Sequence, residues 1–220
     1  MTVIIGGSGT ANGISYFSSP TTFAGTLNVS GTANVAQGLS TVARGINNAS
    51  VPSGGVLQVI QTHVTDAYSY GVSGYPTMTD TALTATITPL YSTSKIFVMI
   101  DSMWGAVASS QHISQRLKRT ISGSSSYIGE ATNVGSRPAS IGGMGAQIAY
   151  NASSAQDYML FASLLKYLDS PGTTSSVTYT MTVCAYSNST LYLNRTYADR
   201  TGGTYDPRAT SSVVLMEIAQ

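Results

Sequence analysis

Charged side chains are scarce in this chain of 220 residues. Lysine, arginine, aspartate and glutamate make up 9% of it, against roughly 25% in an average soluble protein. The net charge is +1, so the composition does not supply the clustered basic face that nucleic-acid binding needs. Residues 1–65 hold one charged side chain, Arg44. So little charge protects a free monomer poorly, which favours a chain that buries much of its surface in an assembly.

Cysteine and recognisable catalytic motifs are also scarce. The single cysteine, Cys184, excludes an intrachain disulfide and a cysteine-built zinc site, and we expect a small buried residue on a strand. The histidines, His63 and His112, are expected on strand surfaces. A Ser-His-Asp arrangement stays open, but no G-x-S-x-G turn or phosphate-binding loop accompanies it. Two acids such as Asp157 and Asp169 could pair as in a glycosidase, although nothing selects them. We assign no catalytic residue, cofactor or metal, and expect no enzyme.

No segment predicts export or membrane insertion. The start, MTVIIGGSGTANG, lacks the basic region of a signal peptide, and its apolar run is short. No stretch has the roughly 20 apolar residues of a membrane-spanning helix. We therefore expect neither a membrane nor a nucleic-acid partner.

Residues 1–52 form a zone rich in glycine, serine, threonine and asparagine. Within it, GTLNVSGTANV at 25–35 writes Gly-Thr-x-Asn-Val twice, six residues apart. Apolar residues often stand two apart, which is typical of strands rather than helices. Such a segment cannot close a core alone, so we predict an attachment or stalk segment that packs against copies of itself or a docking surface. The candidate assembly residues are Phe23, Leu27, Val29 and Val35.

Beyond a Pro/Gly/Ser linker signal at 49–55, residues 53–220 form a series of short predicted strands separated by turn residues. This pattern predicts an all-β domain, an antiparallel β-sandwich of jelly-roll-like type. The predicted strands are 56–64, 82–90, 94–105, 112–121, 145–150, 158–169, 176–186, 189–195 and 211–219.

Some of these strands carry more specific expectations. Alternation places Leu83, Ala85 and Ile87 on one face of their strand. The segment 94–105 is almost continuously apolar, which predicts a strand buried on both faces. The segment 155–168 also fits helical spacing, but its β context and the turn that follows favour a strand.

The sequence RLKR at 116–119 is the one concentration of charge. On a strand, Arg116 and Lys118 lie on one face, and Leu117 and Arg119 on the other. The simpler interpretation is a solvated or edge strand on which charge prevents aggregation. The alternative is an anion contact in an assembly or with a receptor.

Tyrosine is the abundant aromatic residue, with fourteen tyrosines against four phenylalanines and one tryptophan. A tyrosine ring stacks while its hydroxyl hydrogen-bonds, which suits interfaces and sugar-facing surfaces. Tyrosines gather in two predicted binding loops, DAYSYGVSGYP and RTYADRTGGTYDPR. The tryptophan, at the end of an apolar strand, is either core or an exposed platform. The candidate receptor or interface residues are Tyr68, Tyr70, Tyr75, Trp104, Tyr197 and Tyr205.

Several motifs occur in a definite order between residues 56 and 220. They are TxLxxxITPxxxxSKIxVxI at 81–100, an LDxP…YT hairpin at 168–180, the pair Asn194 and Arg195, and a closing S…MEI at 211–218. As an ordered set they resemble the C-terminal head of tailed-phage fibre-like proteins. The resemblance covers most of the chain and transfers no catalytic residue.

The resemblance implies a virion protein with a jelly-roll-like, trimeric head, in tail fibres or as particle decoration. We therefore predict a bacteriophage structural protein, a short tail fibre or receptor-binding protein located in the virion and assembled in the host cytoplasm. Residues 1–52 would attach to tail, baseplate or capsid proteins, and the homotrimeric head would contact host surface polysaccharide through many weak contacts. The alternative is a capsid decoration (cement) protein, and the remote alternative is a small carbohydrate-active enzyme.

Overall fold

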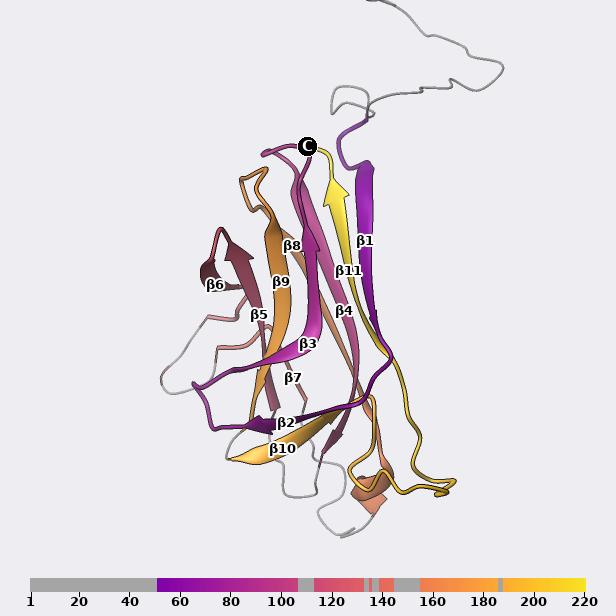
Figure 1. Cartoon of the computed structure of the whole chain (residues 1–220). Helices are drawn as coiled ribbons and strands as arrows, with labels where there is room; N and C mark the ends of the chain where they lie inside the picture. The colour runs from indigo at the N-terminus through magenta and orange to yellow at the C-terminus, as the bar shows by residue number, and fades with distance from the viewer. Residues whose placement is uncertain (1–50, 107–112, 133–134, 136–138, 145–154, 186–187) are drawn as a thin grey trace, which may run out of the picture. The chain divides into compact units, whose positions relative to one another are not determined.

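The computed structural model describes residues 51–106, 113–132, 135, 139–144, 155–185 and 188–220, and this part of the chain is nearly all β (Figure 1). The first sheet contains β1 (Val56–Val64), β2 (Tyr68–Val72), β4 (Lys95–Ala106), β8 (Phe161–Asp169), β10 (Ser189–Leu193) and β11 (Ser211–Ile218). The second contains β3 (Thr79–Ile87), β5 (Ile113–Ile121), β6 (Ser124–Ile128), β7 (Gly142–Met144) and β9 (Val177–Cys184). One 3₁₀ turn, η1 (Ala155–Tyr158), precedes β8. All strand ladders between these elements are antiparallel, which confirms the predicted all-β, antiparallel class, while the jelly-roll-like type stays a prediction.

The long strand β4 lies at the centre of the first sheet. One edge of β4 pairs with β8 over residues 96–104. The other edge pairs first with β11, over residues 95–101, and then with β10, over residues 104–106. Since β1 lies outside β11 and β2 outside β10, the sheet runs β1-β11-β4-β8 along most of its length and is extended at one end by β10 and β2 (Figure 1).

The second sheet has the order β3-β9-β5-β6, with β7 on the same edge of β5 as β6. Its inward side chains and those of the first sheet form one hydrophobic core. Leu83, Ala85 and Ile87 of β3 are buried in that core, as predicted. The two sheets therefore pack face to face as a sandwich around side chains that alternate along each strand.

The predicted burial of β4 on both faces is wrong. Its buried residues are Ile96, Val98, Ile100, Ser102 and Trp104. The residues between them are partly buried or exposed. The apolar run therefore contributes to two surfaces: the core on one face of the sheet and a partly exposed outer face on the other.

Several boundaries also differ from the predictions. Tyr68 and Tyr70, predicted in a loop, lie on β2, and Gly142–Met144, which no predicted strand includes, form β7. The segment predicted as strand at 158–169 forms η1 at its start and then β8. The predicted strand 145–150 lies outside the described residues, as does the proposed stalk within 1–50, so the boundary at residue 52 stays a prediction.

The basic cluster lies on β5, which is an interior strand with β9 on one edge and β6 and β7 on the other. The edge-strand interpretation is therefore wrong, although the predicted division between the two faces is confirmed. On the outer face, Arg116 pairs with Glu130 and Lys118 pairs with Asp80. On the inner face, Arg119 points into the sandwich. The chain itself supplies an anion for each of these cations.

Asp169, at the end of β8, joins the two sheets across the interior. Its carboxylate accepts hydrogen bonds from the Arg119 guanidinium of β5, at 2.9 and 3.1 Å, and from the Tyr179 hydroxyl of β9, at 2.7 Å. Asp169 and Tyr179 are buried. Burial, and then the hydrogen bond to Asp169, raises the pKa of Tyr179, so its hydroxyl stays a donor at neutral pH.

Glu217 of β11 makes a second internal anchor. Its carboxylate accepts from the backbone N–H groups of Leu90, at 2.8 Å, and Tyr91, at 3.2 Å. It also accepts from the Gln58 side-chain amide at 2.6 Å. Glu217 is fully buried, so these bonds supply the partners that a buried carboxylate needs. They tie the segment after β3 to the opposite sheet.

The Asp169→Ala variant is expected to lower the free energy of unfolding by about 3 kcal/mol, because a guanidinium and a buried hydroxyl lose their acceptor. The matched control is Asp80→Ala, which removes a carboxylate that is 59% exposed. The control should cost less than about 1 kcal/mol. Urea denaturation at pH 7 measures both values, and equal costs would contradict the cross-sheet role of Asp169.

Candidate functional site

The loop between β10 and β11, residues 194–210, starts at a buried asparagine. The Asn194 side-chain amide donates to the backbone carbonyls of Val64, at 2.8 Å, and Asp66, at 3.0 Å. Its side-chain oxygen accepts from the Ser211 hydroxyl at 2.6 Å. Asn194 has a φ of 62°, a left-handed conformation that asparagine adopts more readily than most residues. One side chain therefore holds both ends of the loop and the end of β1.

The loop crosses β4 directly over Gly105. A Cβ at Gly105 would collide with the carbonyl oxygen of Arg195 and come within 3.0 Å of the Thr196 Cα. Glycine is required here because strand and loop backbones touch without a side chain between them. This close approach fixes where the polar residues of the loop begin.

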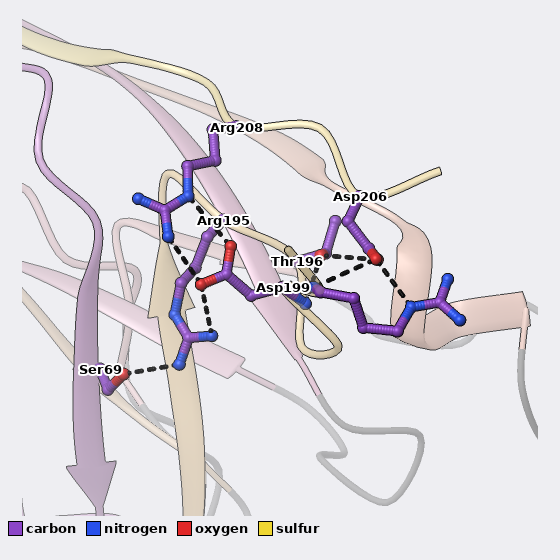
Figure 2. A network of polar contacts seen from close by, with 7 residues as sticks. Ser69, Arg195, Thr196, Asp199, Asp206 and Arg208 are labelled. Atoms are coloured by element: carbon purple, nitrogen blue, oxygen red, sulfur yellow. Dashed lines mark hydrogen bonds and ion pairs between the residues drawn. The ribbon is translucent and has the colours of Figure 1, made fainter. Parts of the chain in front are cut away.

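A network of polar contacts then joins the loop to β2 (Figure 2). The Asp199 carboxylate accepts two hydrogen bonds from the Arg208 guanidinium, at 3.0 and 2.8 Å. It also forms an ion pair with the Arg195 guanidinium, at 3.2 Å. Arg195 also donates to the Ser69 hydroxyl on β2 at 2.9 Å. The two-pronged Arg208–carboxylate contact is the stronger and more directional form of this interaction.

Asp206 organises the other half of the loop (Figure 2). It accepts from the Arg200 side chain at 2.9 Å and from the Thr196 hydroxyl at 3.2 Å. Burial acts to raise the pKa of Asp206, but the hydrogen bonds from Arg200 and Thr196 outweigh it and leave the pKa below its ordinary value. A carboxylate that stays ionised is a poor proton donor, so this geometry favours a structural role over general acid chemistry.

Tyrosine rings surround the network. The Arg195 guanidinium lies 4.2 Å from the ring centroid of Tyr192 on β10, and the Tyr192 and Tyr197 rings lie 5.7 Å apart. The Arg200 guanidinium lies 4.4 Å from the ring of Tyr158 in η1. Such cation–π contacts hold ring and cation together. We call the following set the loop cluster: Ser69, Tyr192, Arg195, Tyr197, Asp199, Tyr205 and Arg208.

The loop cluster presents aromatic surface and hydrogen-bond donors together. Tyr197 is exposed, and Tyr205 is 73% exposed. Arg208 is 64% exposed and commits two of its guanidinium N–H groups to Asp199, so donors remain for a ligand. Rings pack against the apolar faces of sugars, and guanidinium groups bind hydroxyl or carboxylate oxygens. The arrangement suits a polyhydroxylated ligand, including an acidic one.

The structure divides the predicted receptor residues. Tyr68 is exposed on β2 and stacks on Tyr70, with ring centroids 6.0 Å apart. The Tyr70 hydroxyl accepts from the backbone N–H of Ala82 at 2.8 Å, and partial burial raises the pKa of Tyr70. Trp104 is fully buried, with its ring 6.1 Å from that of Tyr70. Burial favours the core interpretation of Trp104 over the exposed platform.

The remaining sequence candidates lie apart from the loop cluster or outside the described residues. Tyr75 is partly buried, and its backbone N–H bonds to Ala185 at 3.3 Å. His63 is exposed on β1. Cys184 is buried on β9 as expected, and burial raises the pKa of its thiol. Outside the described residues lie Phe23, Leu27, Val29, Val35 and His112.

Of the hypothetical glycosidase pair, Asp169 holds its carboxylate in the cross-sheet contact with Arg119 and Tyr179. Asp157 lies in η1, where its backbone carbonyl accepts from the backbone N–H of Ala198 at 3.0 Å. Among the described residues, no group of three or more His, Cys, Asp or Glu side chains is arranged to hold a metal ion. No helix in the described part of the chain is long and apolar enough to span a membrane.

Sequence reasoning missed Arg195, Asp199 and Arg208 as site residues. A usable signal was present, because five of the chain's nineteen charged side chains fall within residues 195–208. Their pairing was not readable, since the ion pairs join residues four and nine apart in an irregular loop.

Replacement of the loop anchor, Asn194→Ala, is expected to lower the free energy of unfolding by about 3 kcal/mol. The buried carbonyl of Val64, the partly buried carbonyl of Asp66 and the Ser211 hydroxyl lose their partner, and alanine tolerates the left-handed backbone less well. The control Asn188→Ala, at an exposed position, should stay within about 0.5 kcal/mol of the wild type. Thermal unfolding followed by circular dichroism compares the two, and a wild-type midpoint for Asn194→Ala would refute the anchoring role.

Removal of the shared carboxylate, Asp199→Ala, is expected to open the loop, because Arg195 and Arg208 both lose their partner. Trypsin cleavage after Arg200 or Arg208 should become about tenfold faster, since proteolysis follows local opening. The control is Asp66→Ala, which removes an exposed side chain that makes no described ion pair. Mass spectrometry of the fragments gives the rates, and unchanged loop cleavage would show that the network does not order the loop.

No protein-family model matches the chain, and no curated protein matches it. The geometry of the loop cluster and the ordered motifs therefore carry the functional argument.

Proposed function

We propose that this chain is a bacteriophage virion structural protein, and that its sandwich is the head of a short tail fibre or receptor-binding protein. The loop cluster would contact host surface polysaccharide. The observation that carries this proposal is the Arg–Asp network of the β10–β11 loop, where the Tyr192 ring packs on Arg195 and the exposed Tyr197 ring packs on Tyr192, with the exposed Tyr205 on the same loop. Binding residues held on a loop by a β scaffold are a common arrangement for recognition.

The residues that carry the family resemblance support the proposal in a different way. Asp169 belongs to the LDxP motif, Asn194 to the Asn-Arg pair, and Ser211 and Glu217 to the closing motif. Each makes an internal hydrogen bond that holds the sandwich together. The resemblance therefore concerns the scaffold, which a family can keep while its receptor loops change.

In this proposal the head is jelly-roll-like and trimeric, and residues 1–52 attach it to tail, baseplate or capsid proteins. The mechanism involves no chemistry. Several heads on one particle would turn weak sugar contacts into strong attachment, because the second contact forms at a high effective concentration.

One observation favours the alternative function of a capsid decoration protein. The first sheet carries an apolar outer face that a neighbouring protein could cover. Antibody labelling of particles in the electron microscope separates the two functions. Label at the tail supports the fibre proposal, whereas label spread over the capsid supports decoration and overturns it.

The variants Tyr197→Ala and Tyr205→Ala are each expected to weaken polysaccharide binding about three- to tenfold, the loss of one ring contact. The control is Tyr127→Ala, an equally drastic change at an exposed ring on β6 of the other sheet. Binding to a panel of purified bacterial surface polysaccharides is measured by biolayer interferometry. Equal losses for all three variants, or no binding by the wild type, would overturn the sugar contact.

A further inference from the structure

The outer face of the sheet β1-β11-β4-β8 carries one row of side chains that is apolar across the full width of the sheet. The pairing register places Val59, Met216, Phe97 and Leu168 in one row, one residue from each strand. Val59 is 54% exposed and Leu168 is 47% exposed. Phe97 and Met216 between them are partly buried. A complete apolar row therefore crosses four neighbouring strands that lie side by side in Figure 1.

Further along the strands, apolar and polar residues share the face. Two residues further along β4, Met99 and Val214 lie in a row between Gln61 of β1 and Lys166 of β8. Two residues beyond that, Leu164, which is 53% exposed, lies in a row with Asp101, Ser212 and His63. We call this surface the apolar outer face and define it by Val59, Phe97, Met99, Leu164, Leu168 and Met216.

The outer face of the other sheet has the opposite character. Thr84 and Thr180 hydrogen-bond through their hydroxyls at 2.9 Å, and Thr86 and Thr178 do so at 2.8 Å. Arg116 and Lys118 lie beside them in ion pairs. One side of the sandwich is thus built to face water, whereas contiguous apolar surface on the other is typical of an interaction site.

The charged side chains on the apolar outer face form no ion pair with the described residues. Of the eight described basic residues, six form ion pairs with described acids. The two that form none, Lys95 and Lys166, both lie on this face by register, and so does Asp101, which also has no described ion pair. The face therefore offers unpaired charge of both signs.

We propose that the apolar outer face is the docking site for a second copy of this chain, with Lys166 of one copy beside Asp101 of the next. A copy of the same face supplies both the apolar surface and the missing charges. Residues 1–50 fit less well as the occupant, because they contain no acidic residue to pair with the lysines. A lipid surface fits less well because Asp101 would be buried against it. The interface does not depend on the polysaccharide proposal.

The first test measures the solution mass of the full chain by light scattering at several concentrations. The double variant Leu164→Lys/Leu168→Lys should weaken association at least 100-fold, because four or more buried lysines would face each other. The control Thr86→Lys/Ser125→Lys adds the same charge to exposed positions on the other sheet and should associate like the wild type. A monomeric wild type, or equal association of both variants, overturns the proposal.

The second test locates the interface independently of residues 1–50. Leu168→Cys and the control Ser125→Cys are each labelled with a maleimide in the full chain, where Cys184 is buried. Between the dilute and the associated sample, Leu168→Cys should be labelled at least tenfold more slowly, and Ser125→Cys at an unchanged rate. An associated sample in which Leu168→Cys is labelled as fast as in the dilute sample overturns the proposal. Protection that requires added phosphatidylcholine vesicles overturns it in favour of a lipid surface.

The third test addresses the charge contact. Lys166→Asp and Asp101→Lys should each weaken association about tenfold, because each places like charges together. The combined variant restores opposite charges and should associate nearly as well as the wild type. Losses that simply add in the combined variant overturn the pairing of Lys166 with Asp101.

Discussion

The carboxylate of Asp169 is buried between the two sheets, where a guanidinium and a hydroxyl from the opposite sheet are its partners. An apolar interior alone permits many relative positions of two sheets, whereas a buried charge permits only those that satisfy it. Gln115 of β5 adds a second cross-sheet bond, since its side-chain oxygen accepts from Ser163 of β8 at 2.7 Å. With β8 fixed in this way, β4 is fixed beside it, and β4 carries Gly105, where the loop is seated.

The internal anchors explain why the recognisable motifs do not name a receptor. Asn194, Ser211 and Glu217 are buried, and their side chains satisfy backbone or hydroxyl groups where strands end. Replacing any of them leaves a buried polar group without a partner, which destabilises the scaffold. Under the proposed receptor function, recognition would reside in residues that the motifs leave out, such as the exposed Tyr205.

The strand pattern made most of the fold predictable, because alternation of apolar and polar residues reports a half-buried sheet directly. The predicted burial of β4 on both faces failed because an apolar residue can lie either in the core or on an exposed outer face. An apolar residue on β4 serves the core at Val98 and the outer surface at Phe97, and the sequence holds no sign of which face is covered. The strand β2 was missed because glycines surround its tyrosines. The ion pairs of the loop cluster were not predicted, because they form only when the loop takes its observed path. That path depends on the close contact of the loop with Gly105 and on the hydrogen bonds of Asn194.

The low charge of the chain also has a structural explanation. Most of the described basic residues form ion pairs within the chain, as Arg119 and Arg208 do. Few unpaired charges are therefore present on the surface of the described residues. On the second sheet, threonine hydroxyls that bond in pairs take over that task, as Thr86 and Thr178 do. On the first sheet no such hydroxyl row exists among the outward residues of β4, which are Lys95, Phe97, Met99, Asp101 and Met103. Hydroxyl groups on one outer face and exposed apolar side chains on the other fit the proposed association between copies, because burial of the second face would remove those side chains from water.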